Sequence, residues 1–329
     1  MDIRFGIAGL GAIANRFAKV INSDETSGVV LSAVASKDAE RAAAFAKTHN
    51  SSCFYGSYEE LADDPNIDIV YIATTHNFHF ENAKLFIERG KNVICEKPFF
   101  LTKKDAEEIY ALAKEKNVFV MEAMWTRCLP AFQKTLEWVR SGRIGDVKLI
   151  DASFCFNTPF DPKNRLFNPE LAGGALYDGG VYPIEFITGI AGQTPNAVNA
   201  FAVKGKSGVD EYATVDLSFQ NGILGQARCG VSVFANNDAH IYGTRGSIHI
   251  DYFIGAKTCE LRDENGNTAE RFESSFEDGF CFEINHAAAS DNKVIACAVE
   301  VVVCYSAVVD YRCAFFNDKG VSLVSDGNV

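Results

Sequence analysis

Residues that could bind a phosphate group follow the first apolar run of the chain. The sequence G-L-G-A-I-A at 9–14 comes directly after Ile3–Ala8. In such a motif Gly9 permits a tight turn, Gly11 lets the backbone approach a pyrophosphate, and Ala14 lets a helix pack closely on a strand. Free N–H groups at the start of a helix attract phosphate. The motif therefore predicts a dinucleotide site that includes Gly9, Gly11, Ala12 and Ile13.

The segment after the run Val29–Ala35 bears on the choice between NAD and NADP. NAD-specific sites commonly place an acidic side chain here, which accepts a hydrogen bond from the ribose 2′-hydroxyl. Ser36 and Lys37 stand here instead, and a hydroxyl and a cation suit the 2′-phosphate of NADP. We therefore expect NADP in preference to NAD. The charge of Asp38 opposes this interpretation, and the alternative is that Lys37 is a solvated residue at the start of a helix.

Two further polar clusters follow the runs Ile67–Ala73 and Lys91–Cys95. Ligands of open α/β sheets bind at the carboxyl ends of the strands. Proline restricts the residue before it to extended backbone, so Lys97, which precedes Pro98, is directed by its strand. The alternative for Lys97 is a loop lysine paired with a neighbouring acid. The candidates for cofactor binding here are Thr74, Thr75, His76, Asn77, His79, Glu96 and Lys97.

The elements that position these residues alternate over the first 120 residues. Short β-branched runs are separated by stretches of helical spacing, which predicts βαβ units and a doubly wound parallel sheet. Thr102 is a suitable N-cap with Asp105 three residues on. The expected strands are Ile3–Ala8, Val29–Ala35, Cys53–Tyr55, Ile67–Ala73, Lys91–Cys95 and Asn117–Met121, and the expected helices are Ala39–Lys47, Phe78–Arg89 and Thr102–Lys116.

The rhythm changes after about residue 125. One helix, Leu129–Ser141, precedes strands in which apolar and polar residues alternate, as in Ala213–Phe219. Such alternation buries one face of a sheet and exposes the other. Asn221-Gly222 is a hairpin signal before the next strand. A chain of 329 residues is long enough for two domains, and we expect the second to be built on a large, mostly antiparallel open sheet.

Charge and cysteine usage exclude several classes of protein. The 31 Lys and Arg against 43 Asp and Glu give a net charge of -12, which repels nucleic acids and anionic membranes. We expect neither as a partner. Ten scattered cysteines without a C-x-x-C pair and an N-terminus without a signal sequence indicate reduced thiols and a cytoplasmic location. The apolar segment Val294–Val309 is shorter than the ~20 residues that span a bilayer and is interpreted as core.

Four motifs together resemble the glucose-fructose oxidoreductase and inositol dehydrogenase (Gfo/Idh/MocA) family. They are the motif at 9–14, T-T-H-N-F-H at 74–79, E-K-P at 96–98 and G-G-A-L-Y-D-G-G-V-Y-P at 173–183. Tyr182 stands where many members have histidine, and with M-E-A-M-W-T-R at 121–127 it is similar to the branch of dimeric dihydrodiol dehydrogenases and NADP-dependent xylose dehydrogenases. The chain departs from the family pattern at Thr75, usually proline, and at Gly179-Gly180, usually Ile-Gly.

The resemblance implies an architecture and an assembly. It implies an α/β fold with an N-terminal Rossmann domain, residues 1–122, followed by an α+β substrate-binding and dimerisation domain, residues 123–329. The resemblance is compatible with a C-terminal helix that packs on the first domain. The resemblance further implies a homodimer, or a higher homo-oligomer, formed through the open sheet.

The resemblance also implies which residues are catalytic. Lys97 then lies beside the nicotinamide of NADP or NAD, and Asp178 and Tyr182 come from the second domain. As a hypothesis, Tyr182 takes the alcohol proton; a phenol with a pKa near ~10 needs a neighbouring cation for this, and Lys97 is the candidate. Whether Tyr182 or Lys97 takes the proton is left open. The candidates for substrate binding are Trp125, Arg127, Asn157, Arg165 and Tyr182.

The leading prediction is an oxidoreductase that acts on a sugar, a polyol or a related hydroxy or carbonyl compound. The alternative is a non-catalytic dinucleotide-binding sensor or scaffold, which has no need of all three catalytic groups. No metal site is expected, because His76 and His79 lie three residues apart without a carboxylate or cysteine in register. His240 and His249 are interpreted as surface or interface residues.

Overall fold

The computed structural model describes residues 2–290, so the segment Val294–Val309 lies outside the described residues. The chain divides into two compact units. The first comprises the residues up to Trp125 together with the segment that begins at Phe276, and the second comprises Thr126–Ser275. Each unit is described below by itself.

A six-stranded sheet forms the centre of the first unit, with the strand order β3-β2-β1-β4-β5-β6. Every strand pair in it is parallel, which confirms the predicted doubly wound parallel sheet. The strands are β1 (Ile3–Ala8), β2 (Val29–Ala35), β3 (Cys53–Tyr55), β4 (Ile69–Ile72), β5 (Asn92–Glu96) and β6 (Val120–Ala123). The helices are α1 (Ala12–Ile21), α2 (Ala39–Thr48), α3 (Tyr58–Asp63), α4 (His79–Glu88), α5 (Lys103–Lys116) and α8 (Phe280–Ser290).

Local sequence signals explain both ends of α5. The side chain of Thr102 accepts a hydrogen bond from the N–H of Asp105, as the sequence predicts. Asn117 ends the helix with a left-handed backbone, φ 54°, a conformation that asparagine tolerates. The predicted strand Asn117–Met121 was therefore wrong at its start: Asn117 caps the helix, and β6 begins only at Val120.

Helix α8 belongs to the first unit although more than 250 residues separate it from α1. Arg16 of α1 donates two hydrogen bonds to Asp278, at 2.6 and 2.8 Å, and its guanidinium lies 4.0 Å from the ring centroid of Phe280. The backbone N–H groups of Glu277 and Asp278 donate to the carboxylate of Glu25. Hydrogen bonds and packing therefore attach this segment to α1.

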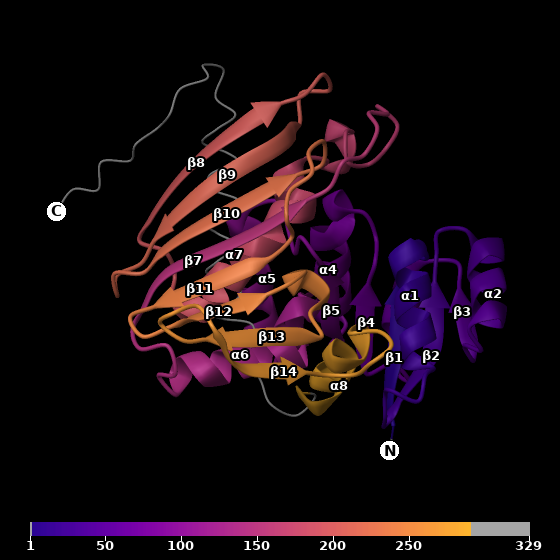
Figure 1. Cartoon of the computed structure of the whole chain (residues 1–329). Coiled ribbons are helices and arrows are strands. Elements are labelled where there is room, and N and C mark those ends of the chain that lie inside the picture. The colour runs from indigo at the N-terminus through magenta and orange to yellow at the C-terminus, as the bar shows by residue number, and fades with distance from the viewer. Residues whose placement is uncertain (1, 291–329) are drawn as a thin grey trace. The chain divides into compact units, whose positions relative to one another are not determined.

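An eight-stranded sheet forms the second unit, in the order β14-β13-β12-β11-β7-β10-β9-β8 (Figure 1). All neighbouring pairs are antiparallel except β7 and β10, as predicted. Helices α6 (Pro130–Arg140) and α7 (Val181–Ala191) pack on one face. The strands are β7 (Val147–Cys155), β8 (Ala197–Lys204), β9 (Asp210–Ser218), β10 (Leu224–Gly230), β11 (Ala239–Gly243), β12 (Ser247–Ile250), β13 (Thr258–Arg262) and β14 (Thr268–Glu273).

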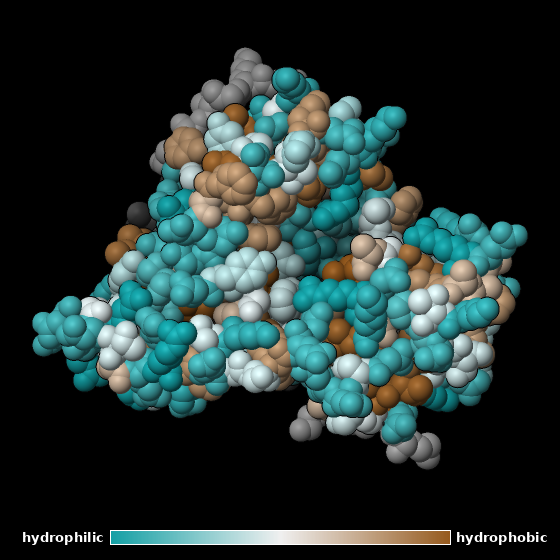
Figure 2. All heavy atoms as spheres, turned by 45° about the vertical axis from the view of Figure 1, so that its right-hand side comes forward, coloured by the Kyte–Doolittle hydropathy of each residue, from teal (hydrophilic) through white to brown (hydrophobic). Residues whose placement is uncertain are grey.

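The opposite face of this sheet is here called the outer face, and no helix of the described residues packs on it. Alternate residues of β9, β10 and β11 are buried against the helices, and the residues between them point to the outer face. The apolar side chains exposed there include Leu149, Phe201, Tyr212 and Leu224. In Figure 2, tan and brown apolar side chains gather in the upper part of the view, among polar ones.

Candidate active site

The parallel register of the first sheet brings the predicted cofactor residues to one edge. Ala8 of β1 pairs with Ile72 of β4, and Ile72 pairs with Cys95 of β5. The residues that directly follow these strands therefore lie side by side, at what we call the carboxyl edge. They include Gly9, Thr74 and Lys97.

The glycine motif has the geometry that a pyrophosphate requires. Gly9 has φ +88°, and a Cβ built on it would lie 2.8 Å from Cγ2 of Thr74, so another residue here would be strained and crowded. A Cβ on Gly11 would meet no described heavy atom within 4 Å, so the space above its backbone is open. Gly11 is also the N-cap of α1, and no described side chain caps the helix there. The helix N-terminus can therefore accept an anionic phosphate.

Arg41, in the first turn of the helix that follows β2, is a cation that the sequence analysis did not identify. Arg41 of α2 donates through Nη2 to the backbone oxygen of Leu10, inside the glycine motif. Lys37 is exposed, with Nζ 5.3 Å from the ring centroid of Phe78. Two cations therefore stand near the turn after β2, where a ribose 2′-phosphate binds in NADP sites. The available sequence signal was an arginine in the first turn of α2, but the sequence does not say that its side chain points toward the glycine motif.

The polar side chains of Ser36 and Asp38, at the end of β2, have local roles. The Ser36 hydroxyl accepts from the N–H of Asp38 at 3.2 Å. The carboxylate of Asp38 accepts from the N–H of Arg41 and so caps α2. This cap gives the Asp38 charge a structural function at the helix start, so the residue need not oppose a phosphate directly.

His79 links two loops of the carboxyl edge. Its side chain is fully buried, with Nδ1 2.9 Å from the oxygen of Pro98 and Nε2 3.1 Å from the oxygen of Thr74. Burial lowers the pKa of His79, since the uncharged form is favoured there. The structure shows that His79 holds the Thr74 loop to the Lys97–Pro98 loop, and its expected role in cofactor binding stays a prediction.

The rest of the Thr74 loop is held by short local hydrogen bonds. The Thr75 hydroxyl donates to Oδ1 of Asn77 at 2.8 Å. Asn82 of α4 donates to the Thr74 hydroxyl at 3.1 Å. His76 is half-buried and begins a 3-10 turn, His76–Phe78. Thr75, which replaces the usual proline of the family pattern, therefore takes part in a hydrogen-bonded turn.

Glu96 is buried at the end of β5, directly before Lys97. Tyr71 donates its hydroxyl hydrogen to Oε1 of Glu96, and the N–H of Lys97 donates to Oε2 at 3.1 Å. Burial raises the pKa of Glu96, against the opposing effects of Tyr71 and Lys97. These contacts fix the backbone from which the half-buried Lys97 side chain projects.

Two more buried acids adjoin Glu96, and the sequence analysis missed both. Glu122 accepts a hydrogen bond from the N–H of Phe99 at 2.9 Å. Glu283 of α8 is fully buried, and neither carboxylate oxygen has a hydrogen-bond partner among the described residues. Burial, with the charge of Glu96 next, raises the pKa of Glu283 well above its usual value, which favours the uncharged carboxyl. A glutamate inside the apolar run F-C-F-E-I was the available sequence signal.

In the second unit, Asp178 and Tyr182 lie on consecutive helical turns. Asp178 belongs to a π-helical turn, Leu176–Gly180, and Tyr182 to α7 directly after it. Both side chains are buried: Asp178 accepts from Nη1 of Arg165 at 2.7 Å, and the Tyr182 ring centroid lies 5.5 Å from that of Phe154. π-Helical turns are frequent at functional sites.

A buried aspartate fixes the start of this π-helical turn. Oδ2 of Asp210 accepts from the N–H of Leu176 at 2.6 Å. Gly174 has φ +122°, and a Cβ on it would lie 2.3 Å from Oδ1 of Asp210, so only glycine allows this approach. Gly180 packs close to Cys229 in the same way: a Cβ there would lie 3.0 Å from its Sγ. Asp210 was not identified from sequence, because its partner is 34 residues away.

Two of the predicted substrate residues make structural contacts, and their substrate role stays a prediction. Arg127 forms an ion pair with the buried Glu185, so it stabilises the second unit from within. Trp125 is buried in the first unit, where its ring packs edge-on against Phe280 with centroids 5.4 Å apart. Asn157 is exposed and pairs with Ser232 in an isolated bridge. Of the remaining candidates, Arg165 has a half-exposed side chain and contacts Asp178.

Family models match most of the described chain. Residues 3–124 match the model described as an oxidoreductase family with an NAD-binding Rossmann fold. Residues 132–249 match the Gfo/Idh/MocA C-terminal domain.

Curated relatives and solved structures agree with these models. Trans-1,2-dihydrobenzene-1,2-diol dehydrogenase of Mus musculus is 38% identical over 76% of this chain and 75% of its own length. The enzyme of that name from Xenopus laevis is 34% identical over 87% and 88%. Aldose-aldose oxidoreductase from Caulobacter crescentus shares the fold, with a TM-score of 0.85, 24% identity and coverage of 95% and 98%. A levoglucosan dehydrogenase complexed with NADH and levoglucosan has a TM-score of 0.83, 21% identity and coverage of 95% and 98%.

Proposed function

Because the chain belongs to the Gfo/Idh/MocA family of NAD(P)-dependent oxidoreductases, we propose that it transfers a hydride between NADP and a sugar, a polyol or a trans-dihydrodiol. The observation that carries this proposal is the carboxyl edge. An open helix N-terminus without a described side-chain cap, at Gly11, stands at the same edge of one sheet as Lys97. One motif serves the phosphates of the cofactor, and the other supplies a cation for the reacting oxygen.

The residues of this chain have separable roles in the proposed reaction. A bound nicotinamide supplies the carbon, C4, that accepts or donates the hydride. When an alcohol is oxidised, its C–H bond breaks to give the hydride and its O–H bond releases a proton to Tyr182 or Lys97. Lys97 stabilises the negative charge that develops on the oxygen, and such a preorganised donor is worth about 3–4 kcal/mol. Asp178, held by Arg165, orients the substrate hydroxyl.

The preference for NADP rests on Ser36, Lys37 and Arg41 after β2. Titration of the protein with NADPH and NADH, followed by cofactor fluorescence, tests it. We expect tighter binding of NADPH, and a larger loss of NADPH than of NADH affinity in Arg41→Met. The matched control is Arg89→Met, since Arg89 is an arginine of the same unit paired with the exposed Asp63. Tighter binding of NADH by the wild type would contradict the preference.

The substrate class is proposed from the relatives and tested by turnover. Reduced-cofactor absorbance is followed with NADP and a panel of aldoses, polyols and trans-dihydrodiols, and with NADPH and the matching carbonyl compounds. We expect one class to give turnover. If the protein binds NADPH and no compound of the panel reacts, the non-catalytic sensor is the better description.

We further propose that the outer face of the second sheet forms a homodimer. Large exposed apolar patches on a domain mark interaction surfaces, and Leu224, at the start of β10 on this face, is 53% exposed. Light scattering after size exclusion is expected to give twice the chain mass for the wild type and one chain mass for Leu224→Arg. Phe54, 50% exposed on β3 of the first unit, provides the control Phe54→Arg, which should stay dimeric. A monomeric wild type would contradict the proposal.

We propose a cytoplasmic location, which the cysteines support. All seven described cysteines are free thiols, and five of them are buried. Free thiols are typical of reducing compartments. Separately, no described helix is long and apolar enough to cross a membrane. Fluorescence microscopy of the tagged chain would test the location.

A further inference from the structure

Four metal-ligating side chains meet on the outer face of the second sheet, the face that is proposed above to form the homodimer. Asp238 and His240 lie two residues apart at the start of β11, and His249 and Asp251 lie two residues apart at the end of β12. Residues two apart on a strand point to the same face. Because His240 pairs with His249 in the antiparallel register, the sequence D-x-H on one strand faces H-x-D on the next.

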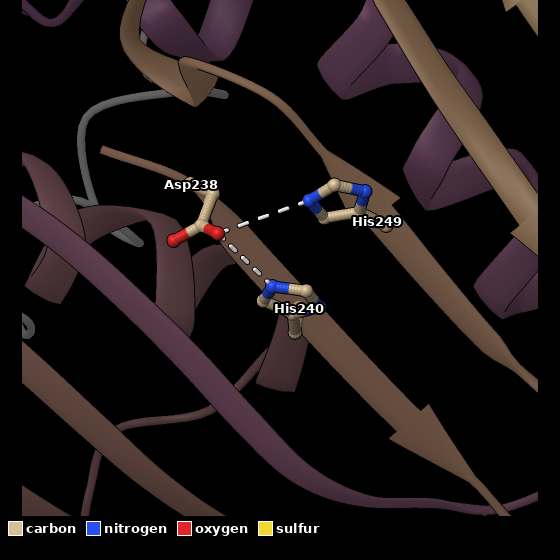
Figure 3. Close-up of side chains that lie close together, drawn as sticks. All are labelled: Asp238, His240 and His249. Carbon is tan, nitrogen blue, oxygen red and sulfur yellow. Dashed lines mark hydrogen bonds and ion pairs between the residues drawn. The ribbon is translucent and has the colours of Figure 1, made fainter. Parts of the chain in front are cut away.

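The ligand atoms of this group have the spacing of a metal site. Nε2 of His240 lies 3.2 Å and Nε2 of His249 lies 3.9 Å from Oδ2 of Asp238. Both imidazoles direct a nitrogen at the same carboxylate (Figure 3). Nε2 of His249 is also 3.4 Å from Oδ1 of Asp251. Tetrahedral ligands at about 2.0–2.1 Å from a zinc ion lie roughly 3.3 Å from one another, so little movement is needed to enclose an ion.

Charge gives a second, independent reason for a cation here. Asp238 and Asp251 lie one residue beyond the last pair of β11 and β12, Ala239 with Ile250, and both carboxylates lie within 4 Å of Nε2 of His249. Like charges directly opposite on paired strands are destabilising. A divalent cation between them would remove this repulsion. Among the described residues, Asp238, His240 and His249 are the one group of three His, Cys, Asp or Glu that is close enough to hold a metal ion.

We propose that Asp238, His240 and His249 bind a divalent transition metal ion of the zinc type, with Asp251 or water completing the coordination. Imidazole nitrogen with carboxylate oxygen is a ligand set that zinc accepts. The bound ion ties β11 to β12. Mg²⁺ and Ca²⁺ prefer oxygen ligands alone and are not expected to compete.

Arg262 of β13 provides a further test of the proposal, because its contact with His249 opposes metal binding. Its Nη2 lies 2.9 Å from Nδ1 of His249. A guanidinium only donates hydrogen bonds, so without metal the imidazole proton sits on Nε2, facing the two aspartates. Metal binding at Nε2 must move that proton to Nδ1, where Arg262 cannot accept it. In Arg262→Gln the amide oxygen can accept from Nδ1–H, as outer-shell partners of zinc-bound histidines do, so zinc should bind more tightly.

The test measures Zn²⁺ binding to the full, tag-free chain by competition with a chromophoric chelator. The wild type is expected to bind one Zn²⁺ per chain at this site. In His240→Gln and in His249→Gln the affinity of the site for Zn²⁺ should fall at least about 10-fold, since even outer-shell changes cost about 10–100-fold. Ser247→Ala, on the same strand and face as His249, is the matched control and should bind like the wild type. Zinc held elsewhere, for example by the exposed Cys53, is present in every variant and cancels in the comparison.

Three further readouts keep the test decisive. Co²⁺ in place of Zn²⁺ should give the visible absorption of a tetrahedral site in the wild type and not in His240→Gln. If a histidine variant fails to fold by circular dichroism, Asp238→Asn replaces it. Arg262→Gln should bind Zn²⁺ more tightly than the wild type. The proposal is overturned if the wild type and the His240 and His249 variants bind equal Zn²⁺, or if Arg262→Gln weakens binding.

Discussion

The carboxyl edge of the first sheet and the helical segment from Gly174 to Ala191 in the second unit place reactive groups by different means. At the carboxyl edge, parallel strands end in register and the backbone does the placing: Gly9 is required by its φ of +88°, and Lys97 follows β5 directly. In the helical segment, buried side chains position the reactive groups. Asp210 holds the N-terminus of the π-helical turn, and Arg127 pairs with Glu185 of α7. A site fixed by backbone is visible in a motif, whereas a site fixed by distant side chains is not.

The largest expected effect comes from removing the cation of the carboxyl edge. Lys97→Met should lower kcat by about 10²–10⁴-fold, the range for losing an electrostatic or acid–base group. The affinity for NADPH should stay within about 2-fold, because the glycine motif that holds the phosphates is untouched. Steady-state kinetics and NADPH fluorescence titration measure the two effects separately. Lys84→Met, which removes one side of an exposed ion pair with Glu108, is the control. A kcat of Lys97→Met close to that of the wild type would contradict the catalytic role of Lys97.

The next effect tests whether buried side chains maintain the helical segment. Glu185→Gln removes the charge that pairs with Arg127, and breaking such a mostly buried ion pair should cost about 3 kcal/mol of unfolding free energy. Chemical denaturation measures this cost. If Arg127 is structural, as the ion pair indicates, KM stays within about 2-fold for the folded variant. A normal stability with a strongly raised KM would instead support the predicted role of Arg127 as a substrate ligand.

The control for Glu185→Gln breaks an exposed ion pair. Glu108→Gln removes the partner of Lys84, and both side chains are more than a third exposed. Exposed pairs contribute less than about 1 kcal/mol. Equal losses in the two variants would show that burial does not distinguish the pairs.

The smallest expected effect tests the backbone of the glycine motif. Gly9→Ala and Gly28→Ala both force a residue with a Cβ into positive φ, which costs about 1–3 kcal/mol. Only the Cβ at position 9 meets a neighbour, Thr74, while that at position 28 meets no described heavy atom within 4 Å. Gly9→Ala should therefore have the lower Tm and should also weaken NADPH binding. The same Tm and the same NADPH affinity in both variants would contradict the proposed role of Gly9.

The same contrast explains which features could be predicted from the sequence. The positions of the strands and the residues after each strand followed from apolar runs and turn residues, so Gly11 and Lys97 were found. Arg41 and Glu283 were missed because their contacts join segments far apart in the chain, 31 residues for Arg41 and Leu10. Asn117 was misassigned because a left-handed helix cap and the start of a strand look alike in sequence.

The histidines of the outer face also show that contacts between separate strands are not visible in a local motif. His240 and His249 were each interpreted as surface residues. The D-x-H and H-x-D sequences acquire meaning only when the register of β11 and β12 sets them opposite one another. Register between strands depends on the whole sheet, and a local motif does not contain it.

The central claim is direct hydride transfer to the cofactor. The substrate that the panel identifies is prepared with deuterium on its reacting carbon and oxidised with NADP by the wild type, and the reduced cofactor is analysed by mass spectrometry and NMR. We predict one deuterium at C4 of the nicotinamide in the wild type, and the same product formed about 10²–10⁴-fold more slowly by Lys97→Met. Reduced cofactor without deuterium, or no reduction by a wild type that binds NADP, would contradict the account.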